Sequence, residues 1–183
     1  MGSLQSILTR NEVENPVGNK IQIRIAAMGD RGAGKSAFIN AIRGVDDDDD
    51  NAAPTGVCKI TEEPTEYKHP ENPMISFVKL PDIDTPTYPD LETLCEKIGV
   101  DVYDVFLIFT ASRFTIRDLE LARKVKSTRK PFFLVRTKID EDWRNERRKR
   151  RFDEMEMLKA IRDFCMRNAR RFLESDDHVF LIS

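Results

Sequence analysis

The sequence reads Gly29-Asp30-Arg31-Gly32-Ala33-Gly34-Lys35-Ser36 between a segment that alternates apolar and polar residues and a segment with helical spacing. This is the complete G-x-x-x-x-G-K-[ST] pattern of a phosphate-binding loop. Glycines let successive backbone N–H groups turn toward an anion, and a helix opening at Ser36 would add its unsatisfied N–H groups. Lys35 would contact the β- and γ-phosphates, and the Ser36 hydroxyl would contact Mg²⁺. We therefore predict that the chain binds a nucleoside diphosphate or triphosphate. The predicted phosphate contacts are Asp30, Arg31, Gly32, Ala33, Gly34, Lys35, Ser36 and Ala37.

The rest of the chain continues the alternation of strands and helices. Apolar alternation and apolar runs predict strands at residues 21–28, 57–67, 74–80, 102–110, 132–136 and 179–182. Helical spacing predicts helices at residues 36–43, 91–98 and 116–126, the last with Ile116, Leu119, Ala122 and Val125 facing inward. A longer amphipathic helix is predicted to be lined by Phe152, Met155, Leu158, Ile161, Cys165 and Phe172. This order predicts an α/β fold, a mostly parallel sheet with helices on both faces.

Composition and charge narrow the class of protein. The 183 residues suffice for one domain with a sizeable core. The chain has 30 basic and 32 acidic side chains, so we expect no nucleic-acid partner. Its 3 cysteines are too few and too scattered for a disulfide framework, which favours a reducing, cytoplasmic location. The apolar runs are far shorter than the roughly 18 residues of a membrane span.

Residues 1–19 are polar and without pattern, and we interpret them as a leader or the remnant of a longer chain. The first six residues, Met-Gly-Ser-Leu-Gln-Ser, fit the N-myristoylation pattern M-G-x-x-x-[ST], in which Gly2 carries the acyl group. The alternative is that Met-Gly-Ser is left over from an expression vector. One acyl chain alone would give only marginal membrane binding.

A second motif, Thr137-Lys138-Ile139-Asp140, directly follows the strand predicted at residues 132–136. Ligands bind at the carboxyl ends of strands in α/β sheets, so we expect this motif beside the phosphate loop. The Asp140 carboxylate can accept hydrogen bonds from guanine N1–H and N2–H₂, which adenine cannot offer, and the alkyl stem of Lys138 can cover the base. The motif predicts GTP or GDP as the ligand. It disfavours a P-loop kinase acting on a small molecule, because such an enzyme has no reason to carry it.

These motifs and their surroundings resemble the immunity-related, interferon-inducible GTPases, which are P-loop GTPases with a Ras-like G domain. The segments that carry the resemblance are residues 38–44 (FINAIRG), 53–56 (APTG), 67–70 (YKHP) and 135–140 (VRTKID). The resemblance implies a GTPase-type switch domain of innate immunity over residues 20–183, without the additional helical domain of the family. It also implies that Thr55 reaches Mg²⁺ and the γ-phosphate, and that Ser183 begins the last guanine-contacting loop. The implied partners are related GTPases, in a nucleotide-dependent homo- or heterodimer, and intracellular membranes, through peripheral contact.

The second switch departs from the family pattern. The family reads D-L-P-G there, whereas this sequence reads Lys79-Leu80-Pro81-Asp82. Lys79 removes a carboxylate from the surroundings of the metal, and Asp82 brings a negative charge to the place where a glycine N–H would face the γ-phosphate. We therefore expect diphosphate to be tolerated better than triphosphate, and hydrolysis to be slow or partner-dependent. A catalytically inactive pseudo-GTPase that regulates related GTPases is the alternative, and a compensating arrangement with Asp82 or Asp84 on the metal stays open.

The candidate catalytic residues are Lys35, Thr55 and Arg31. Arg31 occupies the third loop position, where a side chain would interfere with a catalytic water, act as an arginine finger, or simply be exposed. Residues 46–50 (DDDDD) are predicted to form a surface loop. Residues 147–151 (RRKRR) predict a solvated helix surface, a contact for anionic lipid or an acidic protein, or a nuclear import signal.

Overall fold

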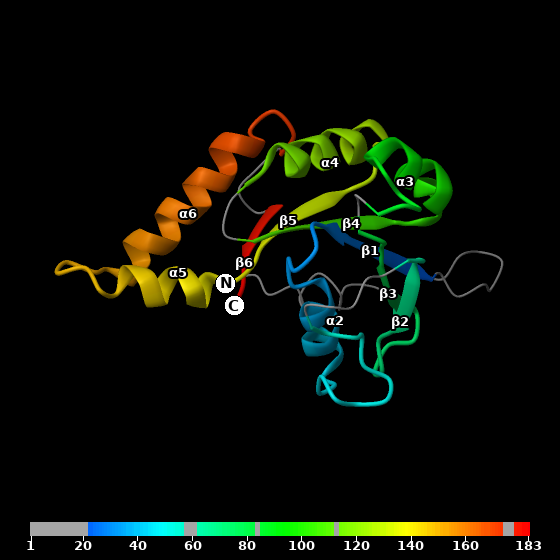
Figure 1. Cartoon of the computed structure of the whole chain (residues 1–183), viewed down its shortest axis with the longest axis horizontal. Helices are drawn as coiled ribbons and strands as arrows, with labels where there is room; N and C mark the ends of the chain where they lie inside the picture. Colours follow the sequence, from blue (N-terminus) through cyan, green and yellow to red (C-terminus); the bar gives the residue numbers. More distant parts are fainter. Residues whose placement is uncertain (1–21, 57–61, 83–84, 112–113, 174–177) are drawn as a thin grey trace, which may run out of the picture.

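The computed structural model describes residues 22–56, 62–82, 85–111, 114–173 and 178–183. Its centre is a six-stranded sheet in the order β2-β3-β1-β4-β5-β6, in which β2 is antiparallel to β3 and the other neighbours are parallel (Figure 1). The strands are β1 (Ile23–Gly29), β2 (Thr65–Lys68), β3 (Ile75–Lys79), β4 (Val105–Thr110), β5 (Phe132–Arg136) and β6 (Val179–Leu181). The helices are α2 (Lys35–Arg43), α3 (Leu91–Ile98), α4 (Ile116–Ser127), α5 (Ile139–Glu146) and α6 (Glu154–Ala169), with a 3₁₀ turn η1 (Val100–Val102). The predicted α/β fold is confirmed.

Apolar side chains cover both faces of the sheet, because successive residues of a strand point to opposite sides. On the central strand β1, Ala26 and Met28 belong to the core beneath α3, α4 and α6. Ile25 and Ala27, which alternate with them, belong to the core beside α2. Figure 1 shows α3 and α4 on one side of the sheet and α2 on the other. The strands β3, β4 and β5 and most of β1 are thus buried between helices, as their apolar residues predict, whereas the edge strand β2 is largely exposed.

The carboxyl ends of the parallel strands lie at one edge of the sheet. Gly29 at the end of β1 is in register with Phe109 of β4, and Thr110 of β4 is in register with Arg136 of β5. On the other side of β1, the chain leaves β3 with Leu80 N donating to Ala27 O at 3.0 Å. The phosphate loop, the second switch and the predicted guanine motif therefore all begin at the same edge.

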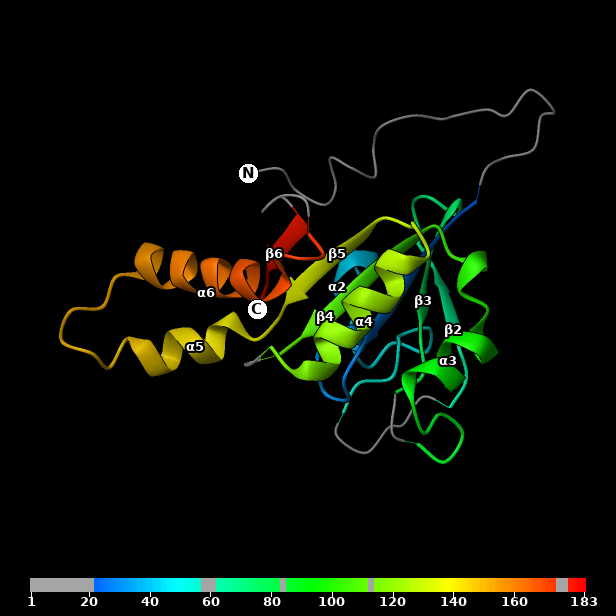
Figure 2. The same ribbon diagram turned by 90° about the horizontal axis from the view of Figure 1, so that it is seen from above.

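The helices α5 and α6 form a pair that projects from the β5–β6 side of the sheet (Figures 1 and 2). The turn that joins them contains the basic residues 147–151, which are all exposed. Arg147 lies over the ring of Trp143, 4.7 Å from its centroid, and Trp143 meets Phe152 edge-on at 6.1 Å. The basic block is solvated as predicted, but it forms a turn rather than a helix, and the sequence interpretation missed α5.

The predicted inward faces of α4 and α6 are partly wrong. Ile116 is 76% exposed and Met155 is 73% exposed. Ala122, Val125 and Cys165 are buried as predicted, whereas the other buried side chains of these helices were not predicted: Asp118 and Leu121 in α4, and Met157 and Ala169 in α6. The predicted row of α4, and that of α6 as far as Ile161, used a spacing of three residues, which falls about 60° short of a full helical turn at every step. Such a row stays on one face for only two or three steps, so the α4 row begins exposed at Ile116 and reaches the buried face at Ala122.

Two predicted strands are shorter than expected. The strand predicted at residues 57–67 is β2, which begins at Thr65; residues 62–64 are not in a strand, and residues 57–61 lie outside the described residues. Pro64 has no N–H to donate to a ladder, which fits a strand that begins after it. The strand predicted at 102–110 begins at Val105, because η1 precedes it. None of the helices in the described ranges is both long and apolar enough to cross a membrane.

Candidate functional site

The phosphate loop leaves β1 at Gly29 and enters α2 at Lys35. Gly29, Gly32 and Gly34 have φ angles of 141°, 76° and 86°, which L side chains rarely adopt. Gly34 is the N-cap of α2, and Phe38 N donates to Gly34 O at 3.0 Å. The first turn of α2 carries no acidic residue, so the positive end of the helix dipole faces the loop uncompensated. This geometry suits an anion.

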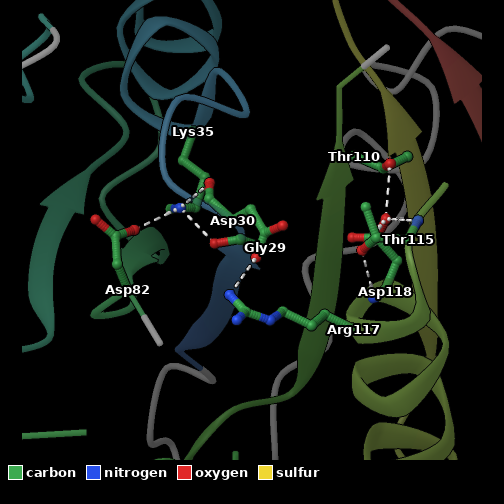
Figure 3. A network of polar contacts seen from close by, with 8 residues as sticks. All are labelled: Gly29, Asp30, Lys35, Asp82, Thr110, Thr115, Arg117 and Asp118. Atoms are coloured by element: carbon green, nitrogen blue, oxygen red, sulfur yellow. Dashed lines mark hydrogen bonds and ion pairs between the residues drawn. The ribbon is translucent and has the colours of Figure 1, made fainter. Parts of the chain in front are cut away.

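The ammonium group of Lys35 is buried and bonded within the protein (Figure 3). Lys35 Nζ donates to Gly29 O at 2.6 Å, to Asp30 O at 2.9 Å and to Asp82 Oδ1 at 2.8 Å. An ammonium has three N–H donors, so these acceptors account for all of them. An incoming phosphate oxygen can bond to this nitrogen only by replacing one of the three.

The two residues by which the second switch departs from the family pattern, Lys79 and Asp82, are both buried. Lys79 is the buried last residue of β3, in register with Ala27 of β1. Asp82 follows three residues later and turns back to Lys35, with only 5% of its surface exposed. The carboxylate that we expected near the γ-phosphate position thus lies on the ammonium group that would contact that phosphate. Asp84, the other candidate for the metal, lies outside the described residues.

The residues predicted to hold Mg²⁺ offer hydroxyl groups. Ser36 is buried in the first turn of α2, and Thr55 is half-buried in the segment that follows α2. Among the described residues, no group of three or more His, Cys, Asp or Glu side chains could hold a metal ion. This donor set fits a Mg²⁺ ion that arrives with a nucleotide, because Mg²⁺ keeps phosphate and water oxygens among its ligands.

Asn40, which sequence reasoning missed, fixes the chain leading to Thr55. Its Nδ2 donates to Ala53 O at 2.9 Å and to Asp47 Oδ1 at 2.8 Å, and Ala53 N donates to Asn40 Oδ1 at 2.6 Å. The backbone two residues before Thr55 is thereby tied to α2. The available signal was an amide side chain on the inward face of a predicted helix, where a buried polar group needs partners.

Thr137 joins the predicted guanine motif to the phosphate loop. Its Oγ1 lies 3.1 Å from Ala33 O and 3.3 Å from Thr110 O, and its N–H donates to Thr110 O at 2.9 Å. The side chain is buried. Two segments separated by 104 positions in the sequence are therefore held together at the edge of the sheet where the carboxyl ends of the parallel strands lie.

The other two polar residues of the motif lie beside Thr137. Lys138 has a left-handed φ of 61° and is the N-cap of α5. Asp140 lies in the first turn of α5, and its carboxylate pairs with Arg144 one turn later. Both side chains of this ion pair are largely exposed, so the pair contributes little stability and a better partner can replace Arg144.

Three further predicted contact residues lie at the rim of the site. Arg31 and Ala37 are exposed. Ser183 is also exposed, and the residue before it is tied to the guanine motif, since Ile139 N donates to Ile182 O at 3.2 Å. Ser183 thus lies next to a residue that is bonded to the guanine motif.

The helix α4 supports the site from the side (Figure 3). Arg117 Nη1 lies 4.0 Å from Asp30 Oδ1 of the phosphate loop. Asp118 Oδ2 accepts from Thr115 N at 2.7 Å and from Thr110 Oγ1 at 3.0 Å, which joins the end of β4 to the start of α4. Burial raises the pKa of the Asp118 carboxyl, although the hydrogen bonds from Thr115 and Thr110 act in the opposite direction.

Comparison with known proteins identifies the family of this chain. A family model described as interferon-inducible GTPase (IIGP) matches residues 3–183. Among curated relatives from Mus musculus, T-cell-specific guanine nucleotide triphosphate-binding protein 2 is 40% identical over 164 residues, covering 88% of this chain and 39% of the relative. Interferon-inducible GTPase 1 is 37% identical, with coverage of 88% and 39%. Interferon-gamma-inducible GTPase 10 is 32% identical, with coverage of 99% and 46%. The chain therefore spans less than half the length of these relatives.

Solved structures are similar in fold. NFeoB from S. thermophilus bound to GDP·AlF4⁻ and K⁺ aligns with a TM-score of 0.51 at 20% identity, over 65% of this chain and 45% of that one. A bacterial selenocysteine-specific elongation factor aligns with a TM-score of 0.58 at 13% identity, over 89% of this chain and 26% of that one. At these identities the likeness shows the P-loop GTPase fold alone. With the family model matching almost the whole sequence, this chain belongs to the interferon-inducible GTPase family.

Proposed function

We propose that this chain is a guanine-nucleotide-binding switch domain that hydrolyses GTP slowly or with the help of a partner. The observation that carries the proposal is the contact of Thr137 Oγ1 with Ala33 O, which sets the predicted guanine motif against the phosphate loop. A nucleotide has phosphates at one end and a base at the other, so its site needs both motifs side by side at the strand ends.

Base recognition would rest on Asp140. An ionised carboxylate accepts hydrogen bonds and donates none, and guanine offers two donors on one edge through N1–H and N2–H₂. The exposed pairing with Arg144 is weak enough for guanine to replace it. One mouse relative at 40% identity is named a guanine nucleotide triphosphate-binding protein, which supports the same choice of base.

Phosphate binding would rest on Lys35 and on the backbone N–H groups at the start of α2. Ser36 and Thr55 would hold Mg²⁺ through their hydroxyl groups. The ion would neutralise part of the charge on the β- and γ-phosphates. The chain's own contribution is to orient the phosphates in the phosphate loop.

Slow hydrolysis follows from the residues near Lys35. A γ-phosphate would meet the negative charge of Asp82. Two like charges 4 Å apart repel each other by about 4 kcal/mol at an effective dielectric constant of about 20. Lys79 stands where the family has a carboxylate. A pseudo-GTPase that regulates related GTPases is the second candidate, favoured by the ion pair between Lys35 and Asp82.

The proposal includes the partners that the family resemblance implies in the cytoplasm. These are a nucleotide-dependent dimer with related GTPases and peripheral contact with intracellular membranes. The exposed basic turn at residues 147–151 supports the membrane contact, because clusters of Lys and Arg are attracted to anionic lipid.

The test is a titration of the purified chain with GDP, a non-hydrolysable GTP analogue and ATP in the presence of Mg²⁺, combined with single-turnover phosphate release from GTP. We expect GDP to bind at least as tightly as the analogue, and phosphate release at or below about 10⁻⁴ s⁻¹. Much faster release would exclude the pseudo-GTPase, and a complete lack of release, even with related GTPases added, would exclude the slow GTPase.

The specificity for guanine is tested by the same titration of the Asp140→Asn variant. This change should lower GDP affinity about 100-fold, because a site built for two donors is left with an amide donor facing them. It should also raise affinity for xanthosine diphosphate, whose C2 carbonyl can accept from that amide. Asp163→Asn, at an exposed position on α6, is the control and should change neither affinity. Unchanged GDP affinity would contradict the guanine site, and ATP binding that the mutation leaves unaltered would indicate a P-loop kinase.

A further inference from the structure

Asp82 occupies the bonding position on Lys35 that a phosphate needs. Its Oδ1 lies 2.8 Å from Lys35 Nζ, while the other two N–H donors of Lys35 are bonded to Gly29 O and Asp30 O. Figure 3 shows these three acceptors converging on one nitrogen. The two carbonyl groups belong to the phosphate loop itself, whereas Asp82 comes from a different segment, 47 positions further along the chain.

The chemistry of the pair makes it a competitor of phosphate. A carboxylate and a phosphate both present anionic oxygens, and both seek charge-assisted hydrogen bonds from the same ammonium group. The side chains of Lys35 and Asp82 are only 4% and 7% exposed, so solvent and salt screen their attraction little. A phosphate oxygen that bonds to Lys35 therefore competes with Asp82, the one acceptor from outside the loop, and the displaced carboxylate then repels the phosphate.

We propose that Asp82 is a specificity-determining residue of this site, an internal anion that holds Lys35 until nucleotide phosphate displaces it. The inference rests on the proposed function in that nucleotide phosphate is the displacing anion. A triphosphate brings one more anionic group toward the displaced carboxylate than a diphosphate does, so the competition disfavours GTP more than GDP.

The replacement of Asp82 by phosphate on Lys35 also decides in which direction the second switch moves. A glycine at this position would present its backbone N–H without a side chain, and a γ-phosphate would draw the segment toward the loop. Asp82 also has a backbone N–H, but its negatively charged side chain is bonded to Lys35, so a phosphate that takes over Lys35 releases the segment from the phosphate loop. Nucleotide binding thus undocks the second switch of this chain.

The experiment compares the wild-type chain with Asp82→Asn and with the control Asp48→Asn. Asn keeps an oxygen that can accept from Lys35 Nζ, so the fold should persist while the charge is lost. Asp48 is exposed in the loop after α2, so its replacement removes the same charge away from Lys35. The probes are inorganic pyrophosphate, which uses the phosphate loop without the guanine motif, and GDP and a non-hydrolysable GTP analogue.

We expect Asp82→Asn to bind pyrophosphate and GDP at least about tenfold more tightly, a factor that corresponds to about 1.4 kcal/mol, and to gain more for the GTP analogue. Asp48→Asn should stay within about twofold of the wild type, because exposed charges are screened. Equal or weaker binding of pyrophosphate and GDP by Asp82→Asn would overturn the inference. If that variant gains pyrophosphate affinity while no variant binds GDP, the inference stands and the guanine function fails. If all three proteins bind GDP equally, the guanine function stands and the inference fails.

A second measurement needs no mutation. Hydrogen exchange of the wild-type chain, followed in peptides that contain Asp82, should become faster when pyrophosphate or GDP saturates the protein. Slower exchange would mean that phosphate docks this segment, and it would overturn the proposal even if Asp82→Asn failed to fold.

Discussion

Gly29 shows at the scale of one residue why the phosphate loop needs glycine at its first position. Its φ is 141°, and a Cβ placed there would lie 2.3 Å from Phe109 O. That oxygen belongs to the backbone of the neighbouring strand β4, so it cannot move aside as a flexible side chain could. Gly32, three positions later, also has a left-handed φ of 76°, but a Cβ there would meet nothing within 4 Å.

We therefore expect Gly29→Ala and Gly32→Ala to differ strongly. Gly29→Ala should lower the free energy of unfolding by about 3 kcal/mol or more, because it combines a strained φ with a backbone clash in the sheet. Gly32→Ala should cost about 1 kcal/mol, the strain alone. Urea denaturation followed by circular dichroism measures both. Equal losses would mean that strand β4 gives way to accommodate the new methyl group.

At the scale of the elements, the sequence predicts where α4 lies but assigns its buried face only in part. Ala122 and Val125 were predicted to face inward and do so, whereas Ile116 is exposed and Leu121, which the row of three omitted, is fully buried. The local pattern could not decide this, because α4 also buries a polar residue, Asp118, whose partners lie at its own N-cap and at the end of β4. A buried carboxylate hides the apolar periodicity on which the prediction depends.

Two leucine-sized residues of α4, Leu121 and Ile116, make this difference measurable. Leu121→Ala should lower the free energy of unfolding by about 2–5 kcal/mol, because it opens a cavity beneath the helix. Ile116→Ala should change it by no more than about 0.5 kcal/mol, because that side chain is 76% exposed. Thermal or chemical denaturation of the two variants decides between the faces. A larger loss for Ile116→Ala would show that the helix packs on the face that the sequence pattern favoured.

At the scale of the whole molecule, the site could be predicted because its motifs stand at strand ends. The order of the strands brings Gly29, Thr110 and Thr137 to one edge of the sheet, and the two sequence motifs suffice to place the phosphate loop beside the guanine motif. The pairing of Lys35 with Asp82 could not be predicted in the same way. It depends on how the chain turns after β3, through Leu80 and Pro81, and on whether Asp82 or a ligand phosphate bonds to the ammonium group of Lys35.

Thr137 makes this arrangement of the whole molecule testable, because a single hydroxyl joins two parts of the nucleotide site. Thr137→Val keeps the shape of the side chain but removes the donor that reaches Ala33 O. A buried carbonyl then lacks this partner, so the free energy of unfolding should fall by about 1–3 kcal/mol. GDP affinity should fall about tenfold as well, because the phosphate loop and the guanine motif are no longer held at a fixed separation.

The matched control is Thr128→Val at the end of α4, where the hydroxyl donates to Val125 O at 2.6 Å. This variant also loses a hydrogen bond from a threonine side chain to a carbonyl group, but that bond lies at the other end of α4 from the nucleotide site. Its free energy of unfolding should also fall, while its GDP affinity should match that of the wild type. Denaturation and calorimetric titration of both variants therefore separate general stability from the positioning of the site. If Thr137→Val lost stability but kept full GDP affinity, the two motifs would be aligned by the sheet alone, and the Thr137 hydroxyl would have no part in holding the nucleotide.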